Sequence, residues 1–160
     1  MKQQFEQVIP AEIEKRSFEI IEAELPHPLN PKLAPIIKRV IHTSADFDYA
    51  DNMYFSPDAV DVALTAIQKG ACIVTDTNMA KAGINKMELK KYGGEVFCFM
   101  ADEDVAASAK QRGTTRAAVS MDKSCFIDRP VIFAIGNAPT ALVRLHELIT
   151  EGRISPLLII

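Results

Sequence analysis

A histidine surrounded by polar side chains is the strongest candidate for chemistry in this sequence. His42 follows an apolar run that carries two cations, and two hydroxyls and two carboxylates follow it within residues 43–48. His27, between two prolines, is expected to be an exposed loop residue, and His146 falls in an amphipathic helix. Imidazole is the side chain that can both give and accept a proton near neutral pH without a perturbed pKa. We therefore expect His42 to be a general acid acting on a bound organic substrate.

A short helix is expected to carry His42 at its carboxyl end. Pro35 is tolerated in the first turn of that helix but would break its middle. The helix dipole at this end, together with Asp46 and Asp48, would favour the imidazolium form that a proton donor needs. The alternative is a histidine that caps the helix end without any ligand, and position alone does not decide between the two.

Ser17 is a second candidate, on a helix expected from Pro10 to Leu25. It faces the same way as the isoleucines of this helix, so its hydroxyl needs a partner there. One interpretation is a hydrogen bond back to the carbonyl of Ile13. The other is contact with a ligand, with Arg16 beside it.

Two later helix starts are candidates for binding anions. Arg116 lies near a helix N-terminus, where the dipole disfavours a cation, and arginine grips carboxylates through two hydrogen bonds. The segment Gly136–Thr140 could also receive an anion, because glycine permits close backbone approach and proline suits a first helical turn. It is not a P-loop, because no Gly-Lys-Ser/Thr follows.

Polar residues also follow the apolar strand expected at residues 71–75. Asp76 and Thr77 lie where open α/β sheets bind ligands, and simple capping of the next helix is the alternative. A run of three acids at residues 102–104 opens a later helix and most simply stabilises its dipole. No metal site is expected.

Apolar runs alternate with helical segments through the second half of the chain. Further strands are expected at residues 96–100 and 130–135, and a fourth begins at Leu157. Short connections between alternating strands and helices indicate a parallel sheet covered on both faces. The expected fold class is α/β, a three-layer α/β/α sandwich with a mainly parallel central sheet, and residues 1–160 are expected to form a single domain.

Two local expectations concern the segment before the first long strand. Residues 53–55 suggest a short strand. Ser56 as N-cap and Pro57 at the first helical position predict a helix through Gln68. Its inner stripe is expected to be Val60, Leu64 and Ile67.

Composition limits the class of protein. A length of 160 residues is enough for one domain with a core, and a net charge of −3 gives no indication of nucleic acid binding. Cys72, Cys98 and Cys125 are odd in number and widely spaced, so we interpret them as reduced thiols of a cytoplasmic protein. The N-terminus lacks the apolar core of a signal peptide, and no apolar run is long enough to cross a membrane.

Several segments of the chain closely resemble one enzyme family, the precorrin-8X methylmutases. The blocks occur in the family's order, and the resemblance runs from about the tenth residue to the end. The blocks are RSFEII (16–21), RVIHTSADFDYA (39–50), TDTNMAKAGINK (75–86), TTRAAVSM (114–121) and GNAPTALVRLHEL (136–148). The second and third look more like the cobalt-precorrin-8 form of the family.

The resemblance implies an isomerase of cobalamin (corrin) biosynthesis that needs no cofactor. Such an enzyme moves a methyl group from C11 to C12 of cobalt-precorrin-8 or precorrin-8X, giving cobyrinate or hydrogenobyrinate. The family's fold is an α/β/α sandwich that forms homodimers, with the pocket near the subunit interface. Its catalytic histidine falls on His42, its substrate-contacting serine on Ser17 and its arginine on Arg116.

The chemistry of a methyl shift agrees with these residues. The rearrangement needs no nucleophile or redox cofactor, but it needs a macrocycle held still and a proton donor. Arg16, Arg116, Lys86 and helix N-termini could neutralise the acetate and propionate groups of the tetrapyrrole. Thr43, next to His42, is a further expected substrate contact.

The chain departs from the family in one respect. The family continues beyond the position of Ile160 with a VGFVGAAESK-like and a RGRxGGS-like segment, so we expect a shortened form. The alternative function is therefore a non-catalytic corrinoid-binding protein. A third, an unrelated α/β enzyme using residues 75–77, is disfavoured by the block matches.

Overall fold

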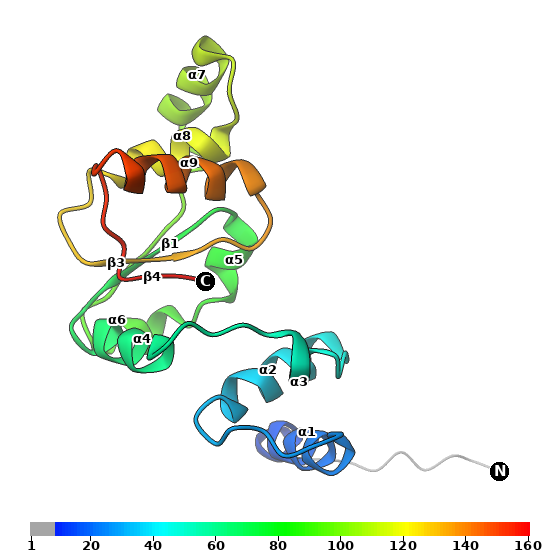
Figure 1. The fold of residues 1–160 in the computed structure, drawn as a ribbon. Helices are drawn as coiled ribbons and strands as arrows, with labels where there is room; N and C mark the ends of the chain where they lie inside the picture. Colours follow the sequence, from blue (N-terminus) through cyan, green and yellow to red (C-terminus); the bar gives the residue numbers. More distant parts are fainter. Residues whose placement is uncertain (1–8) are drawn as a thin grey trace. The chain divides into compact units, whose positions relative to one another are not determined.

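The chain divides into two compact units, the first ending at Val60 and the second running from Asp61 to Ile160. The structure is a computed structural model, and it describes residues 9–160 apart from the side chains of residues 10 and 11. Figure 1 labels the helices and strands in chain order. The single domain expected over residues 1–160 stays a prediction.

Helices build the described part of the first unit. They are α1 (Pro10–Glu24), α2 (Ala34–Ser44) and α3 (Tyr49–Asn52). Ile21 of α1 packs against Ile37 and Ile41 of α2, and all three side chains are buried. The two long helices thus bury a shared apolar seam, which holds His42 of α2 on a fixed support.

Helix α1 has nearly the expected bounds but a different inner face. Proline opens it and the chain leaves it at Leu25, whose N–H still bonds to the carbonyl of Ile21. Ile13 and Ile20 are 49% and 51% exposed, whereas Ile21 is 6% exposed. Ile21 and Leu25, both expected on the inner stripe, pack in the cluster with Ile37 and Ile41, whereas the expectation was wrong for Ile13 and Ile20.

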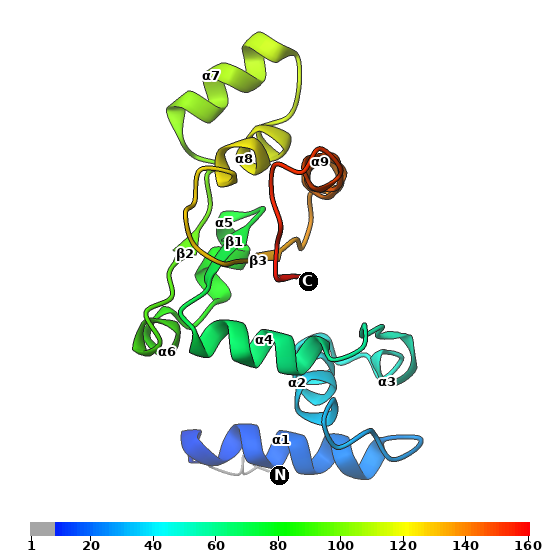
Figure 2. The ribbon, with the colours of Figure 1, turned by 60° about the vertical axis from the view of Figure 1, so that its left-hand side comes forward.

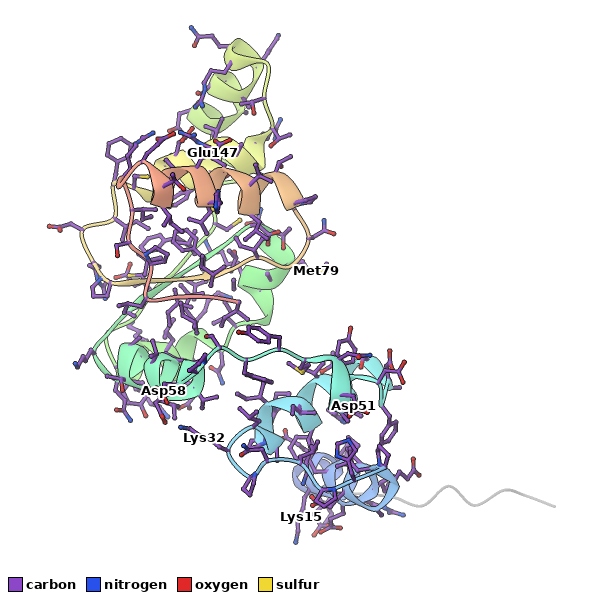
Figure 3. All side chains as sticks on the ribbon, in the orientation of Figure 1. Lys15, Lys32, Asp51, Asp58, Met79 and Glu147 are labelled. Carbon is purple, nitrogen blue, oxygen red and sulfur yellow. The ribbon has the colours of Figure 1, made fainter. Side chains whose placement is uncertain are left out.

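The connection from α3 to α4 (Ala59–Gln68) differs from expectation in two places. Residues 53–55 form no strand and pair with no other segment of residues 9–160. Met53 and Phe55 pack onto the isoleucine cluster of the first unit, whereas Tyr54 is 87% exposed. Asp58, marked in Figure 3, has a left-handed φ of 59°. A helix cannot continue through that conformation, so α4 begins at Ala59 and not at Pro57.

A parallel sheet forms the centre of the second unit. Its strands are β1 (Cys72–Thr75), β2 (Val96–Phe97), β3 (Val131–Ala134) and β4 (Leu158–Ile159). The order is β2-β1-β3-β4, and every pair is parallel. The expected parallel α/β sheet is confirmed, although β2 and β4 are shorter than the apolar runs suggested.

Helices cover both faces of this sheet. Besides α4, the second unit contains α5 (Asn78–Gly83), α6 (Lys86–Lys91), α7 (Glu103–Arg112), α8 (Arg116–Ser124) and α9 (Pro139–Thr150). Of these, α7 packs on α8 and not on the sheet. On one face Phe133 packs with Met121 of α8 and Leu145 of α9; on the other Ile132 packs with Ala66 of α4. Figure 2 shows α9 and α4 on opposite sides of the strands. The second unit thus has the three expected layers.

The inner face of α4 centres on Ala66, and Ile67 packs against the same cluster, as expected. Ala66 is 3% exposed, while Leu64, expected inside, is 54% exposed. Ala66 packs beside Ala71 and Ile132, a seam that brings the helix backbone close to the sheet. The hydrophobic pattern alone favoured the larger leucine, and this expectation was wrong.

The three cysteines are not linked to one another. Cys72 and Cys98 are buried and Cys125 is partly exposed, and all three are free thiols. Residues 9–160 contain no group of three or more His, Cys, Asp or Glu side chains placed to hold a metal ion. Over the same range, no helix combines the length and apolar character that crossing a bilayer requires.

His27 is exposed, as expected, but it is also tied to another element. Its Nε2 lies 2.7 Å from Oδ1 of Asp51 on α3, and its Nδ1 lies 3.3 Å from the carbonyl of Pro28. Figure 3 marks Asp51. Both ring nitrogens face acceptors, which only the imidazolium can satisfy. The hydrogen bond that His27 donates to Asp51, and then the one it donates to the carbonyl of Pro28, raise the pKa of His27.

The core packing yields a first prediction. Leu145→Ala removes a fully buried side chain of α9, and we expect the free energy of unfolding to fall by about 2–5 kcal/mol. Leu142→Ala, on the same helix but 48% exposed, is the matched control and should cost less than about 1 kcal/mol. Urea unfolding at pH 7 measures both, and equal losses would contradict the packing described.

The ion pair of His27 yields a second prediction. Asp51→Asn removes the carboxylate, so the pKa of His27 should fall toward about 6.5. Because the folded-state pKa is raised, the pair's contribution to stability is complete at lower pH and is lost as the pH rises through that pKa. An NMR titration of the imidazole measures the pKa. Asp48→Asn is the control, and an unchanged value in Asp51→Asn would disprove the contact.

Candidate functional site

His42 lies in the last turn of α2 with its side chain exposed. The helix ends two residues later, where Ala45 takes a left-handed φ of 56° and its N–H bonds to the carbonyl of Ile41. The position at the carboxyl end is therefore the expected one. Exposure leaves the imidazole open to a ligand and does not seal it in the apolar seam.

The imidazole of His42 rests against an aromatic ring of α1. The rings of His42 and Phe18 lie 5.8 Å apart at 80°, an edge-to-face contact. Arg39, one turn before the histidine, lies over the Phe18 ring at 5.4 Å and forms an ion pair with Glu14. The sequence reasoning missed Phe18 and Arg39, although Phe18 stands next to Ser17 in the RSFEII block.

The polar residues after His42 are used to end the helix. Thr43 Oγ1 donates to the carbonyl of Arg39 at 2.9 Å, and Ser44 Oγ donates to that of Val40 at 2.8 Å. Asp46 Oδ1 accepts from the N–H of Asp48. Among the described residues, neither carboxylate forms a hydrogen bond with His42. Thr43 still has lone pairs with which to accept a hydrogen bond.

Ser17 lies partly buried on α1, and Arg16 beside it is exposed. Among residues 9–160 the Ser17 hydroxyl has no hydrogen-bond partner, so the back-bond to Ile13 is not formed. A half-buried hydroxyl without an internal partner keeps its donor for another molecule. The arrangement thus leaves open the ligand contact considered from the sequence.

In the second unit, Asp76 forms the best-defined polar contact at the carboxyl end of β1. The side chain is fully buried. Its Oδ1 accepts from the N–H of Gly136 at 3.1 Å, and its Oδ2 accepts from Asn137 at 2.8 Å and Ala138 at 2.6 Å. Thr77, not Asp76, caps α5. Capping of this helix was considered for Asp76 and Thr77, and it is confirmed for Thr77 alone.

These contacts change the interpretation of Asp76 and of the segment 136–140. Burial by itself raises the pKa of Asp76, but the backbone donors of Ala138, Gly136 and Asn137 together outweigh it and hold the pKa below its usual value. The carboxylate of Asp76 thus already occupies the amides at the start of α9. The expectation that Gly136–Thr140 could receive an external anion is wrong for this reason.

Arg116 is the first residue of α8, and its side chain is exposed. Within the described chain its guanidinium has no partner, whereas the other arginines of this range have one. Thr115 caps the helix by accepting from Ala118, and its hydroxyl also donates to Thr140 of α9 at 2.8 Å. The starts of α8 and α9 are therefore joined directly.

Lys86 occupies a different place in the second unit. It opens α6 and lines a cavity of about 550 Å³ with Lys90 and the segment 93–96 that enters β2. That cavity lies at the amino ends of the strands, whereas Asp76 follows a carboxyl end. Lys86 and Arg116 are thus not brought together, and the other candidates belong to the first unit.

Charged clusters on α7 to α9 are internally neutralised. Lys123 bonds to Asp102 and Asp104, which engages two acids of the 102–104 run. Asp122 bonds to Arg112 and Arg144. Burial by itself raises the pKa of Asp122, but the two guanidinium groups outweigh burial, so the pKa lies below its usual value. These pairs bind neighbouring helices to one another.

Comparisons with known proteins agree with the fold. The family model of precorrin-8X methylmutase matches residues 12–160. A cobalt-precorrin-8 methylmutase of Priestia megaterium is 47% identical over 154 residues, covering 96% of this chain and 68% of the relative. A precorrin-8X methylmutase of Pseudomonas aeruginosa is 34% identical over 149 residues, covering 92% of this chain and 71% of the relative.

A solved structure shows the same architecture. The precorrin-8x methyl mutase from Thermus thermophilus superposes with a TM-score of 0.81 at 38% identity, over 93% of this chain and 72% of that one. The α/β class, the resemblance stated from the blocks and the isomerase class of enzyme are thereby confirmed. The chain belongs to the precorrin-8X methylmutase family.

Proposed function

We propose that this chain moves a methyl group from C11 to C12 of a corrin precursor in cobalamin biosynthesis. The carrying observation is the 47% identity, over nearly the whole chain, to a protein named cobalt-precorrin-8 methylmutase. The relative named precorrin-8X methylmutase is less similar, at 34%. This favours cobalt-precorrin-8 as substrate and cobyrinate as product over precorrin-8X and hydrogenobyrinate.

His42 acts as the general acid in this proposal. The methyl group migrates with its bonding electrons, and protonation of a ring nitrogen or an adjacent carbon draws the rearranged π-system toward the product. Substrate and product are isomers, so the proton given by His42 is balanced by one lost from the macrocycle. Exposure of the imidazole and its contact with Phe18 support this role.

Substrate carboxylates and polar edges are bound by the remaining candidates. Within residues 9–160 the guanidinium of Arg116 has no acid partner, which suits it to grip an acetate or propionate. Ser17 keeps an unused hydroxyl donor, and Thr43 can accept. Arg16 and Lys86 add positive charge on exposed surfaces.

The alternative, a corrinoid-binding protein without turnover, is not favoured, because the relatives are named methylmutases. Incubating the chain with cobalt-precorrin-8 or precorrin-8X separates the two, since only an enzyme converts the substrate. A homodimer and a cytoplasmic location belong to the same proposal. Sedimentation of the purified chain tests the first.

We predict that His42→Ala lowers the rate of rearrangement by at least about 10²-fold while binding of the macrocycle persists, because the proton donor is lost but not the binding groups. Turnover is followed by the change in absorbance of the corrinoid. His146→Ala, an exposed histidine of α9, is the control and should react at the parent rate. A fully active His42→Ala would refute the acid role.

We also predict that Arg116→Ala weakens macrocycle binding by about 10-fold or more, because a charged hydrogen-bonded contact contributes about 1.5–3 kcal/mol. Absorbance titration with hydrogenobyrinate gives the Kd. Arg112→Ala on α7 removes an arginine that is paired with Asp122, and it should bind as the parent does. Equal affinities for Arg116→Ala and the parent would count against the assignment.

A further inference from the structure

Asp76 is a buried charge for which the proposed reaction gives no use. Its carboxylate lies at the carboxyl end of β1 and accepts from three successive backbone amides of residues 136–138. Those residues join β3 to α9. The side chain of Asp76 therefore links the carboxyl end of β1 to the segment that follows β3. An aspartate that only capped its own following helix would not make this contact.

A single hydroxyl pair links the start of α9, which follows this loop, to the residue before Arg116. Ala138 is the N-cap of α9 and Thr140 lies in the first turn of that helix. The Thr140 hydroxyl accepts from Thr115, which is the N-cap of α8, and Arg116 is the first residue of α8. Asp76 therefore fixes the start of α9, and α9 in turn holds the residue directly before Arg116.

We propose that Asp76 is a positioning residue that sets the placement of the Arg116 guanidinium through the loop 136–138, Thr140 and Thr115. The proposal rests on the proposed function in one respect, namely that Arg116 binds a substrate carboxylate. Asp76 itself is buried and contacts no substrate.

A second consequence concerns where an anion binds. The N-terminus of α9 would otherwise be an anion site, since its amides point outward and the dipole favours negative charge. Asp76 fills that position from inside, so a substrate carboxylate finds free donors at Arg116 and not at α9. The same side chain thus places the arginine and removes a competing site beside it.

The size of the effect follows from geometry. A bidentate arginine contact depends on the alignment of two parallel hydrogen bonds. A displacement of the binding group by about 1 Å markedly lowers the affinity or the rate constant. Loss of the Asp76 clamp frees the start of α9 and, through the hydroxyl pair, the start of α8. The affinity for the macrocycle should therefore suffer more than the rate constant of the bound substrate.

Two variants test the connection at different points. Asp76→Asn keeps the shape of the side chain but removes its charge and one acceptor oxygen, and Thr140→Val removes the hydroxyl that accepts from Thr115. Thr140 is exposed, so its variant folds even if Asp76→Asn is unstable. Each should raise the Kd for hydrogenobyrinate about 5-fold or more and leave kcat at saturating substrate within about 3-fold.

Thr75→Val is the matched structural control. Thr75 is as buried as Asp76 and its hydroxyl donates to the carbonyl of Thr77, away from the 136–138 loop. Its loss removes a buried hydrogen bond next to Asp76 without touching the connection to Arg116. At a temperature well below unfolding, this variant should bind hydrogenobyrinate with the parent Kd.

A double-mutant cycle with Arg116→Ala decides the proposal. If Asp76 and Thr140 act through Arg116, neither variant raises the Kd further in the Arg116→Ala background. Full additivity, or parent affinity for both single variants while Arg116→Ala binds weakly, overturns the positioning role alone. Parent affinity for Arg116→Ala itself overturns the binding role of Arg116 and this proposal with it.

Discussion

A buried carboxylate must find donors, and this requirement organises the edge of the sheet where β1 and β3 end. Asp76 is fully buried, and an uncompensated charge there would be strongly unfavourable. The amides of residues 136–138 satisfy it, which fixes the path of the chain into α9. The hydroxyl pair of Thr115 and Thr140 then joins α9 to α8. One electrostatic constraint thus determines where two helices begin.

In the first unit, by contrast, His42 is exposed, and the proposed acid role depends on that exposure. His42 sits on a helix whose other side is anchored by Ile37 and Ile41, and its ring leans on Phe18. Arg39 on the same aromatic ring is neutralised by Glu14. A packed seam beneath and an aromatic contact beside it hold an exposed imidazole without burying it, which is the condition for proton transfer to a bound molecule.

Local signals were reliable where local physics decides the structure. Proline opens α1 and α9, Gly113 ends α7 in a left-handed conformation, and Asn85 caps α6. The local signals failed where packing between distant segments decides the structure. Residues 53–55 looked like a strand but have no neighbour to pair with, and Leu64 looked like a core residue until Ala66 proved to face the sheet.

The sequence by itself determined the parallel α/β architecture, the family and the place of His42 at a helix end, because hydrophobic periodicity, capping and the family's blocks are all properties of contiguous residues. Only the tertiary structure decided that Arg116 and Ser17 bond to no side chain within residues 9–160. It also decided the separation of Lys86 from Arg116 and the partners of Asp76. Such contacts join residues about sixty positions apart, as in the pair Asp76–Ala138, and their geometry exists only once the sheet has brought the strand ends together.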